Sequence, residues 1–331
     1  MPGPVETLKV QPEQLLKDLR NLWADLGKEQ EHGVLRACAM TFIVVANEAD
    51  DPSLIGETLG RLMHEHPSRA IVVRVTAENG PQLEARVFAQ CWMPFGKRQQ
   101  ICCEQIEITA SPSSLVDVIT VVRGLIVPDL PVVLYSPDPK LCQTPAFQSM
   151  LPLASKLIVD SSDSPDFSPV EYLHRISSPG LRVGDLLWTR MTPWREAVAR
   201  IFEKPDNVAA AYALENIQML YTGAEDGPAV VYLAGWFMHV LGAGVHLNVA
   251  PGVGPSYAGI ARIDLHGPSL EATIDLTDPN GAELRAGDMH QRIVFPKQGE
   301  CELLRRELAI TGRDRIFEDV LGLANLMKGK T

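Results

Sequence analysis

The sequence has no excess of basic residues. Its 331 residues include 30 Lys and Arg against 41 Asp and Glu, which gives a formal net charge of -11. Proteins that bind nucleic acids neutralise phosphates with clustered Lys and Arg, and the longest basic cluster here is Gly96-Lys97-Arg98. The sequence therefore predicts a protein without a nucleic-acid partner.

Long hydrophobic runs and an export signal are missing as well. A membrane-spanning helix needs about 20 apolar residues, and no run of even about 18 occurs in the chain. The N-terminus is acidic and polar, without the basic start and apolar run of a signal peptide. Six cysteines are few for a chain of this length, so reduced thiols are expected. We therefore predict a cytoplasmic protein without a membrane partner.

The motifs of common enzyme sites are not found either. There is no phosphate-binding Gly-x-x-x-x-Gly-Lys-Ser/Thr loop, and the Gly-x-Gly pairs that begin at Gly242 and Gly252 lack the third glycine of dinucleotide sites. His64 and His66 have the spacing of metal ligands, but the sequence identifies no third ligand for them. The carboxylates are scattered. The sequence thus predicts no catalytic residues, no cofactor and no metal.

What is present is the composition of an ordinary globular protein, 46% hydrophobic and 21% charged. The length is about twice that of one usual domain, so two domains are expected. We place an N-terminal amphipathic helix and linker at 1–33, a first domain at 34–183 and a second at 184–331.

The first domain shows alternating strand and helix patterns. A Leu/Trp stripe predicts the leading helix from Pro12 to Leu26, and the polar run 27–33 predicts a linker. Closely linked strands at 87–108 indicate an antiparallel part. The pattern predicts a layered α/β domain with a mixed, largely parallel sheet. Its expected strands are 40–46, 69–75, 87–92, 101–108, 131–135 and 157–160, and its expected helices are 51–63, 111–124 and 170–176. Asp51 is expected to cap the first of these helices, and Gly124 to end the second in the left-handed conformation.

The second domain begins with helices and continues with strands. Helices are predicted at 193–202, 208–221, 230–241 and 316–327. Residues 270–277 alternate strictly between apolar and polar, and Asp278-Pro-Asn-Gly281 is a strong turn before the next strand. These patterns predict a smaller α+β domain with an antiparallel meander.

Cys102 and Cys103 are adjacent on a predicted strand, so their side chains should point to opposite faces. A redox switch needs an accessible thiol of low pKa and a resolving partner, and Cys91 on the neighbouring strand is a candidate partner. The alternative is that these cysteines are small buried hydrophobic residues. The sequence leaves both interpretations open.

One segment is specific enough to indicate a family. Asp185-Leu-Leu-Trp-Thr-Arg-Met-Thr-Pro-Trp-Arg-Glu196, called here the signature segment, resembles the signature of the OpcA family of glucose-6-phosphate dehydrogenase assembly proteins. The resemblance implies a non-catalytic partner of that dehydrogenase in the oxidative pentose phosphate pathway, one that promotes its assembly or allosteric activation. In photosynthetic members activation is tied to thiol redox state, but those cysteines cannot be matched to this sequence. Weaker similarities occur in the leading helix and at 66–70, 103–106, 128–132 and 233–236.

The signature segment also supplies candidate partner contacts, since Trp and Arg are favoured interface anchors. We predict Trp188 and Arg190, in an exposed loop before a helix, and Arg195 at the start of that helix. Trp194 falls on the apolar stripe of the same helix and is expected in the core. The alternative is that Trp188, Trp194 and Trp236 are all core residues.

Two other functions compete with this one. A sugar-phosphate enzyme such as a lactonase would place its site in the α/β domain, where Arg69 is the candidate phosphate contact. The second alternative is a scaffold protein that binds some other oligomeric enzyme.

Overall fold

The chain divides into two units, and the sequence passes between them more than once. One unit holds residues up to Val159 together with Ser178–Arg182, and the other holds Asp160–Ser177 together with Val183 onward. No helix within the described ranges is long and apolar enough to cross a membrane. The computed structural model describes residues 10–29, 34–77, 82–93, 100–223, 227–242 and 245–328.

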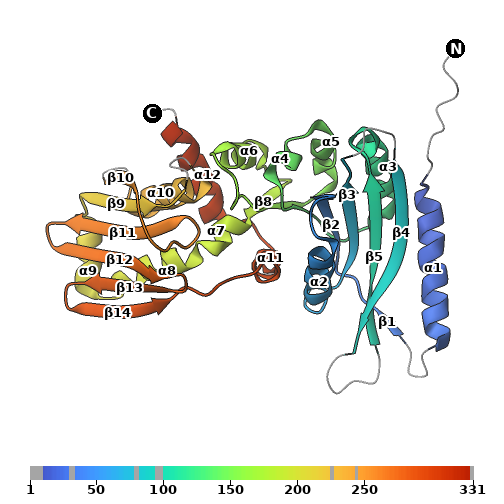
Figure 1. Ribbon diagram of the computed structural model, residues 1–331, viewed down its shortest axis with the longest axis horizontal. Helices are drawn as coiled ribbons and strands as arrows, with labels where there is room; N and C mark the ends of the chain where they lie inside the picture. The colour runs from blue at the N-terminus through green and yellow to red at the C-terminus, as the bar shows by residue number, and fades with distance from the viewer. Residues whose placement is uncertain are drawn as a thin grey trace, which may run out of the picture. The chain divides into compact units, whose positions relative to one another are not determined.

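The first unit is built on a mixed sheet of strand order β1-β5-β3-β2-β6-β7-β8, with β4 paired to β5 (Figure 1). The pairs from β1 to β7 are parallel, and the β4–β5 pair is antiparallel. The prediction of a mixed, largely parallel sheet is thereby confirmed. The strands are β1 (Val34–Arg36), β2 (Met40–Asn47), β3 (Ser68–Val75), β4 (Leu83–Trp92), β5 (Gln100–Ala110), β6 (Val132–Ser136), β7 (Lys156–Val159) and β8 (Arg182–Asp185). Only the first residue of β8, Arg182, belongs to this unit.

The central strands of this sheet are buried along almost their whole length. In β2 and in β3 all but one residue is buried, as expected for parallel strands covered on both faces. Asp51 caps α2 as predicted, since its carboxylate accepts the backbone N–H of Ser53 at 2.8 Å. The helices are α1 (Pro12–Glu29), α2 (Pro52–Leu62), α3 (Leu115–Leu125), α4 (Pro139–Cys142) and α5 (Pro145–Gln148), with short 3₁₀ turns at Pro112–Ser114 and Leu151–Leu153.

Two predictions about this unit are corrected. The leading helix continues to Glu29, so the first part of the predicted linker is helical, while residues 30–33 lie outside the described residues. Gly124 does not end α3 in the left-handed conformation, because the helix runs on to Leu125. Instead, a Cβ on Gly124 would lie 2.6 Å from Cβ of Pro12, so this glycine allows α1 to pack closely against α3.

The second unit contains a six-stranded sheet of order β10-β9-β11-β12-β13-β14. Its pairs are antiparallel except for β9 and β10, which are parallel. The alternation in β12 is confirmed, with Leu270, Ala272, Ile274 and Leu276 buried. The strands are β9 (Asn216–Tyr221), β10 (His246–Pro251), β11 (Ile260–Gly267), β12 (Leu270–Asp278), β13 (Gly281–Ala286) and β14 (Met289–Val294).

Helices pack with this sheet and with one another. Figure 1 shows α6, α10 and α12 near one another, and α12 contacts both of the others. Gly235 permits the close approach of α10 to α12, since a Cβ there would lie 3.1 Å from Val320. The helices are α6 (Ser168–Ile176), α7 (Leu186–Arg190), α8 (Thr192–Ile201), α9 (Pro205–Ala211), α10 (Pro228–Leu241), α11 (Glu300–Ala309) and α12 (Arg315–Lys328).

The predicted helix at 208–221 is wrong. The helix α9 ends at Ala211, and β9 follows with Ile217, Met219 and Tyr221 buried at every second position. The segment begins with alanines, which favour a helix, so the change from helical to strand periodicity further along it was not recognised. The sequence patterns also missed α7 and α11.

Candidate partner-binding surface

The signature segment forms α7 and the start of α8, and its first residue anchors a buried network. Asp185 Oδ1 accepts the N–H groups of Leu187 at 2.9 Å and Ser161 at 3.1 Å, while the Tyr232 hydroxyl donates to Oδ2 at 2.7 Å. Burial, assisted by the charge of Asp160, raises the pKa of Asp185 to about 6. The carboxylate thus ties α7 to the chain before α6 and to α10.

The prediction that Trp188 lies in an exposed loop is wrong. Trp188 lies within α7 and is only 4% exposed. Its indole N–H donates to Asp314 Oδ2 at 3.3 Å, and its ring packs against Tyr232 and Phe317. The Arg195 guanidinium lies 3.6 Å from the ring centroid, a close cation–π contact. The indole therefore has almost no surface to offer a partner.

The two arginines of the segment are also engaged within their own unit. Arg195 donates to the Trp188 carbonyl at 2.9 Å and to Thr192 Oγ1 at 3.0 Å, and burial lowers its pKa to about 10. Arg190 donates to the Gln298 carbonyl at 3.0 Å and to Asp160 Oδ2 at 3.2 Å. A role of Trp188, Arg190 and Arg195 in partner binding stays a prediction, and their contacts favour holding a surface in shape over touching the partner.

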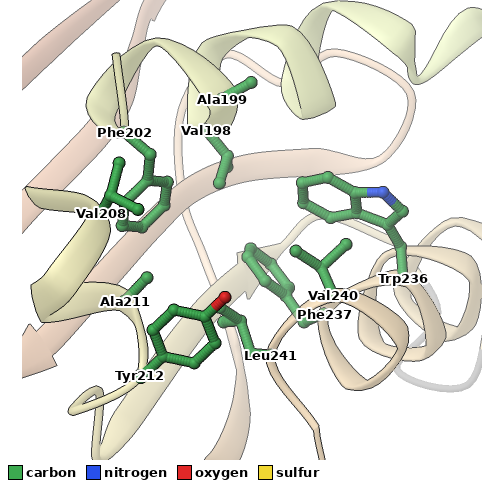
Figure 2. Close-up of a pocket in the computed structure, with 10 residues that line it drawn as sticks. All are labelled: Val198, Ala199, Phe202, Val208, Ala211, Tyr212, Trp236, Phe237, Val240 and Leu241. Atoms are coloured by element: carbon green, nitrogen blue, oxygen red, sulfur yellow. The ribbon is translucent and has the colours of Figure 1, made fainter. Parts of the chain in front are cut away.

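An open apolar surface lies further along the same helix. The helices α8, α9 and α10 enclose a groove of about 280 Å³, the α8–α10 groove (Figure 2). Figure 2 shows aromatic and aliphatic side chains from all three helices turned toward one hollow. Its walls are Val198, Ala199 and Phe202 from α8 and the residue after it, Val208, Ala211 and Tyr212 from α9 and the residue after it, and Trp236, Phe237, Val240 and Leu241 from α10.

The rim of the groove exposes large apolar side chains. Tyr212 is 86% exposed, Val240 52% and Val208 46%. Contiguous exposed apolar surface of this kind marks interaction sites in soluble proteins. Trp236, half-buried in the wall, belongs to the family-like stretch 233–236, and α8 continues the signature segment. One stretch that resembles the family therefore lines the groove, and the helix in which the signature segment ends forms another of its walls.

Acidic side chains flank the α8 wall. Glu196 is exposed and lies on α8 three residues before Ala199, and Glu203, also exposed, follows the end of the helix by two residues. Arg200 is the exposed cation of this helix. The face beside the groove therefore favours a partner surface with basic groups around an apolar centre.

Sequence patterns did not find this groove because its residues come from three helices that meet only in the fold. Val208 and Tyr212 are spaced four residues apart, which was the one available signal, but they fell into the helix wrongly predicted at 208–221.

Among the cysteines, the structure joins Cys91 and Cys102 in a disulfide between paired positions of β4 and β5, with Cα atoms 4.1 Å apart. This differs from the expectation of reduced thiols throughout. Cys103 is free and buried, and burial raises its pKa to about 11, the opposite of an activated thiol. A redox role for Cys91 and Cys102 stays a prediction, and the environment of Cys103 argues against one there.

Arg69 is not positioned as a phosphate contact. It is 7% exposed, its Nε donates to Glu104 Oε2 at 2.6 Å, and its Nη1 donates to the Leu125 carbonyl at 2.6 Å. A buried ion pair of this kind uses the guanidinium's donors internally, so Arg69 gives no support to a sugar-phosphate enzyme. His64 stacks on Trp92, and the described part of the chain holds no cluster of three metal-ligating side chains.

Comparison with known families gives two matches in chain order, both to models named for a glucose-6-phosphate dehydrogenase subunit. The model of its N-terminal domain matches residues 60–177. The model of its C-terminal domain matches residues 181–321.

Relatives agree with these matches. The OpcA protein of Synechocystis sp. is 30% identical over 176 residues, which is 52% of this chain and 36% of that protein. The OpcA protein of Nostoc punctiforme is 26% identical over 179 residues, covering 52% of this chain and 37% of the relative. The matched part thus spans little more than a third of each relative's length.

Solved structures are only distantly similar. An oxidoreductase from Sinorhizobium meliloti is 10% identical, with a TM-score of 0.48 over 87% of this chain and 96% of that one. A likeness at this level carries no argument about activity. The family matches extend over most of the sequence, and the chain belongs to the OpcA family of glucose-6-phosphate dehydrogenase assembly proteins.

Proposed function

We propose that this chain is a non-catalytic partner protein that binds glucose-6-phosphate dehydrogenase in the cytoplasm and promotes its assembly or allosteric activation. The observation that carries the proposal is the pair of family matches, because both models are named as domains of a subunit of that dehydrogenase. The match to the N-terminal domain model comes first in the chain, and the match to the C-terminal domain model follows it.

The α8–α10 groove is the surface we propose for docking. It combines an apolar centre, exposed aromatic and aliphatic rim residues and an acidic flank. Interfaces draw most of their affinity from a few buried aromatic and aliphatic anchors with a polar rim. Trp236 and Tyr212 are the residues of this groove best suited to become such anchors.

Activation by binding requires that the protein favour one state of the dehydrogenase over another. A differential affinity of about 5- to 150-fold, or roughly 1–3 kcal/mol, is typical of such coupling. The groove supplies affinity in this scheme. The buried network of the signature segment supplies rigidity, because it fixes α7 and α8 with hydrogen bonds that do not depend on the partner.

The test is binding of the dehydrogenase from the same organism, measured by titration calorimetry, with dehydrogenase kinetics in parallel. Wild-type protein should bind and alter kcat or KM. Tyr212→Glu should weaken binding at least tenfold because it places a charge in the apolar rim. Val253→Glu is the matched control, since Val253 is 98% exposed in the same unit and lies outside the groove.

Absence of binding by the wild-type protein would refute the proposed function. Binding that Tyr212→Glu leaves unchanged would keep the function and move the docking surface elsewhere.

A further inference from the structure

The first unit contains a cavity of about 550 Å³ that the proposed function does not use. It lies where β2 and β3 end, between the residues that close these strands, Asn47 and Val75, and the segment at Thr144–Ser149. Its size falls within the range of pockets that hold small organic ligands.

The position of the cavity follows from the strand order. The chain leaves β2 for β3 on one side, and later places β6 on the other side of β2, so the direction of winding reverses at β2. Open α/β sheets bind ligands beyond the carboxyl ends of their strands at such a reversal. The cavity lies at that edge, next to the ends of β2 and β3.

A buried hydroxyl in the wall lacks a partner. Thr76, the residue after β3, lines the cavity and is 4% exposed. Its backbone N–H donates to the Ala110 carbonyl at 2.9 Å, but its hydroxyl forms no hydrogen bond with any described residue. Leaving a buried hydroxyl unpaired is unfavourable, so an occupant that bonds to it would be stabilised.

A second polar group in the wall is held in a fixed orientation. Asn47 Nδ2 donates to Asp138 Oδ2 at 2.9 Å, and the Asn47 backbone N–H donates to Asp50 Oδ2 at 2.7 Å. One of the two amide N–H groups is thereby used, and the second N–H and the amide oxygen are left as a donor and an acceptor. A hydroxyl that donates and accepts, together with this oxygen, matches a ligand edge that carries both a donor and an acceptor.

The rest of the wall restricts the ligand's charge. Leu115, Val116, Leu141 and two prolines give it a mainly apolar surface, and no Lys, Arg, His, Asp or Glu of the described chain lines it. A charged ligand would lose hydration without gaining an ion pair. Phosphorylated compounds are therefore poor candidates.

We infer that this cavity binds an uncharged, largely apolar small molecule that carries an amide-type edge, with Thr76 and Asn47 as its hydrogen-bond partners. The apolar wall covers the body of the ligand, and the two polar groups fix its orientation. The cavity shares no lining residue with the α8–α10 groove, so its occupancy can be tested without the dehydrogenase.

Benzamide and benzoate provide a matched pair of probes, since they share shape and differ in charge and in the donor on the edge. They are titrated into the full chain while the methyl resonances of Val and Leu are followed by NMR. Benzamide should shift the methyl signals of Val75 and Leu115 with a dissociation constant in the millimolar range or below. Benzoate should bind at least tenfold more weakly.

Three variants complete the test. Thr76→Val keeps the side-chain shape, removes the hydroxyl and should weaken benzamide binding at least fivefold without lowering the melting temperature. Ala146→Trp, at a partly exposed position of the wall, should abolish the shifts by filling the cavity. Thr277→Val, at an exposed position of β12, should leave binding unchanged.

The inference is overturned if benzamide leaves the cavity methyl signals in place, if benzoate binds as well, or if Thr76→Val binds benzamide like the wild type.

Discussion

Trp188 and Trp236 lie in the same unit, and both belong to stretches that resemble the OpcA family, yet their surroundings differ. Trp188 is closed in by Tyr232, Phe317 and the Arg195 guanidinium. Trp236 is half-buried and forms the wall of an open groove. A specific motif can thus mark the residues that hold a surface, while the surface itself is made by less distinctive residues next to it.

Trp194→Ala tests most directly whether the signature segment holds the neighbouring surface in shape. Trp194 is fully buried, packs edge-on against Phe295 and donates to the Tyr257 carbonyl at 3.0 Å. Its truncation should cost about 3–5 kcal/mol of unfolding free energy, because it leaves a large cavity. Chemical denaturation measures this loss. A cost below about 1 kcal/mol would show that the core of α8 tolerates the cavity and that the segment does not hold it rigid.

A pH dependence should separate the buried network from the groove. The folded-state pKa of Asp185 is raised to about 6 from 3.8, so the native state binds more protons than the unfolded state between these values. Stability should therefore rise as pH falls from about 6 towards 4, by an amount on the order of 3 kcal/mol. The control is Asp185→Asn, which cannot titrate and should lack this part of the slope. Identical slopes in both proteins would place the titration elsewhere.

On the docking side, Trp236→Ala should weaken dehydrogenase binding by about 2 kcal/mol, or roughly 30-fold, as expected for an anchor at the centre of an interface. Its melting temperature should fall much less than that of Trp194→Ala, since Trp236 is only half-buried. Calorimetric titration and thermal denaturation of both variants provide the comparison. If Trp236→Ala binds the dehydrogenase as tightly as the wild type does, Trp236 supports the shape of the surface and does not contact the partner.

The smallest effect should come from the acidic flank of α8. Glu196→Lys combined with Glu203→Lys should slow association severalfold at low salt and less at high salt, because exposed charges steer encounter and are screened. Stopped-flow association at two ionic strengths measures this change. An unaltered rate at low salt would show that the partner does not approach along this face.

The sequence predicted the elements whose periodicity is uninterrupted. The apolar runs of β2 and β3 and the strict alternation of β12 predicted these three strands correctly. The position of Trp194 on the apolar stripe of its helix correctly predicted that it is buried. It failed where neighbouring segments share a composition, as at the change from α9 to β9. It also failed where a side chain's environment is made by distant residues, since the Asp314 and Phe317 that enclose Trp188 lie over 120 positions away.

The path of the chain between the units limits how this protein can be divided or recombined. The crossings fall after Val159, Ser177 and Arg182, so neither unit is one continuous stretch of sequence. A fragment that begins at Val183 would lack Asp160 and Ser161, which bond to Arg190 and Asp185. Exchanging parts of two relatives at a point between Ser161 and Asp185 would separate the partners of both bonds. Asp160 and Arg190, and likewise Ser161 and Asp185, would therefore be expected to change together although 30 and 24 positions separate them.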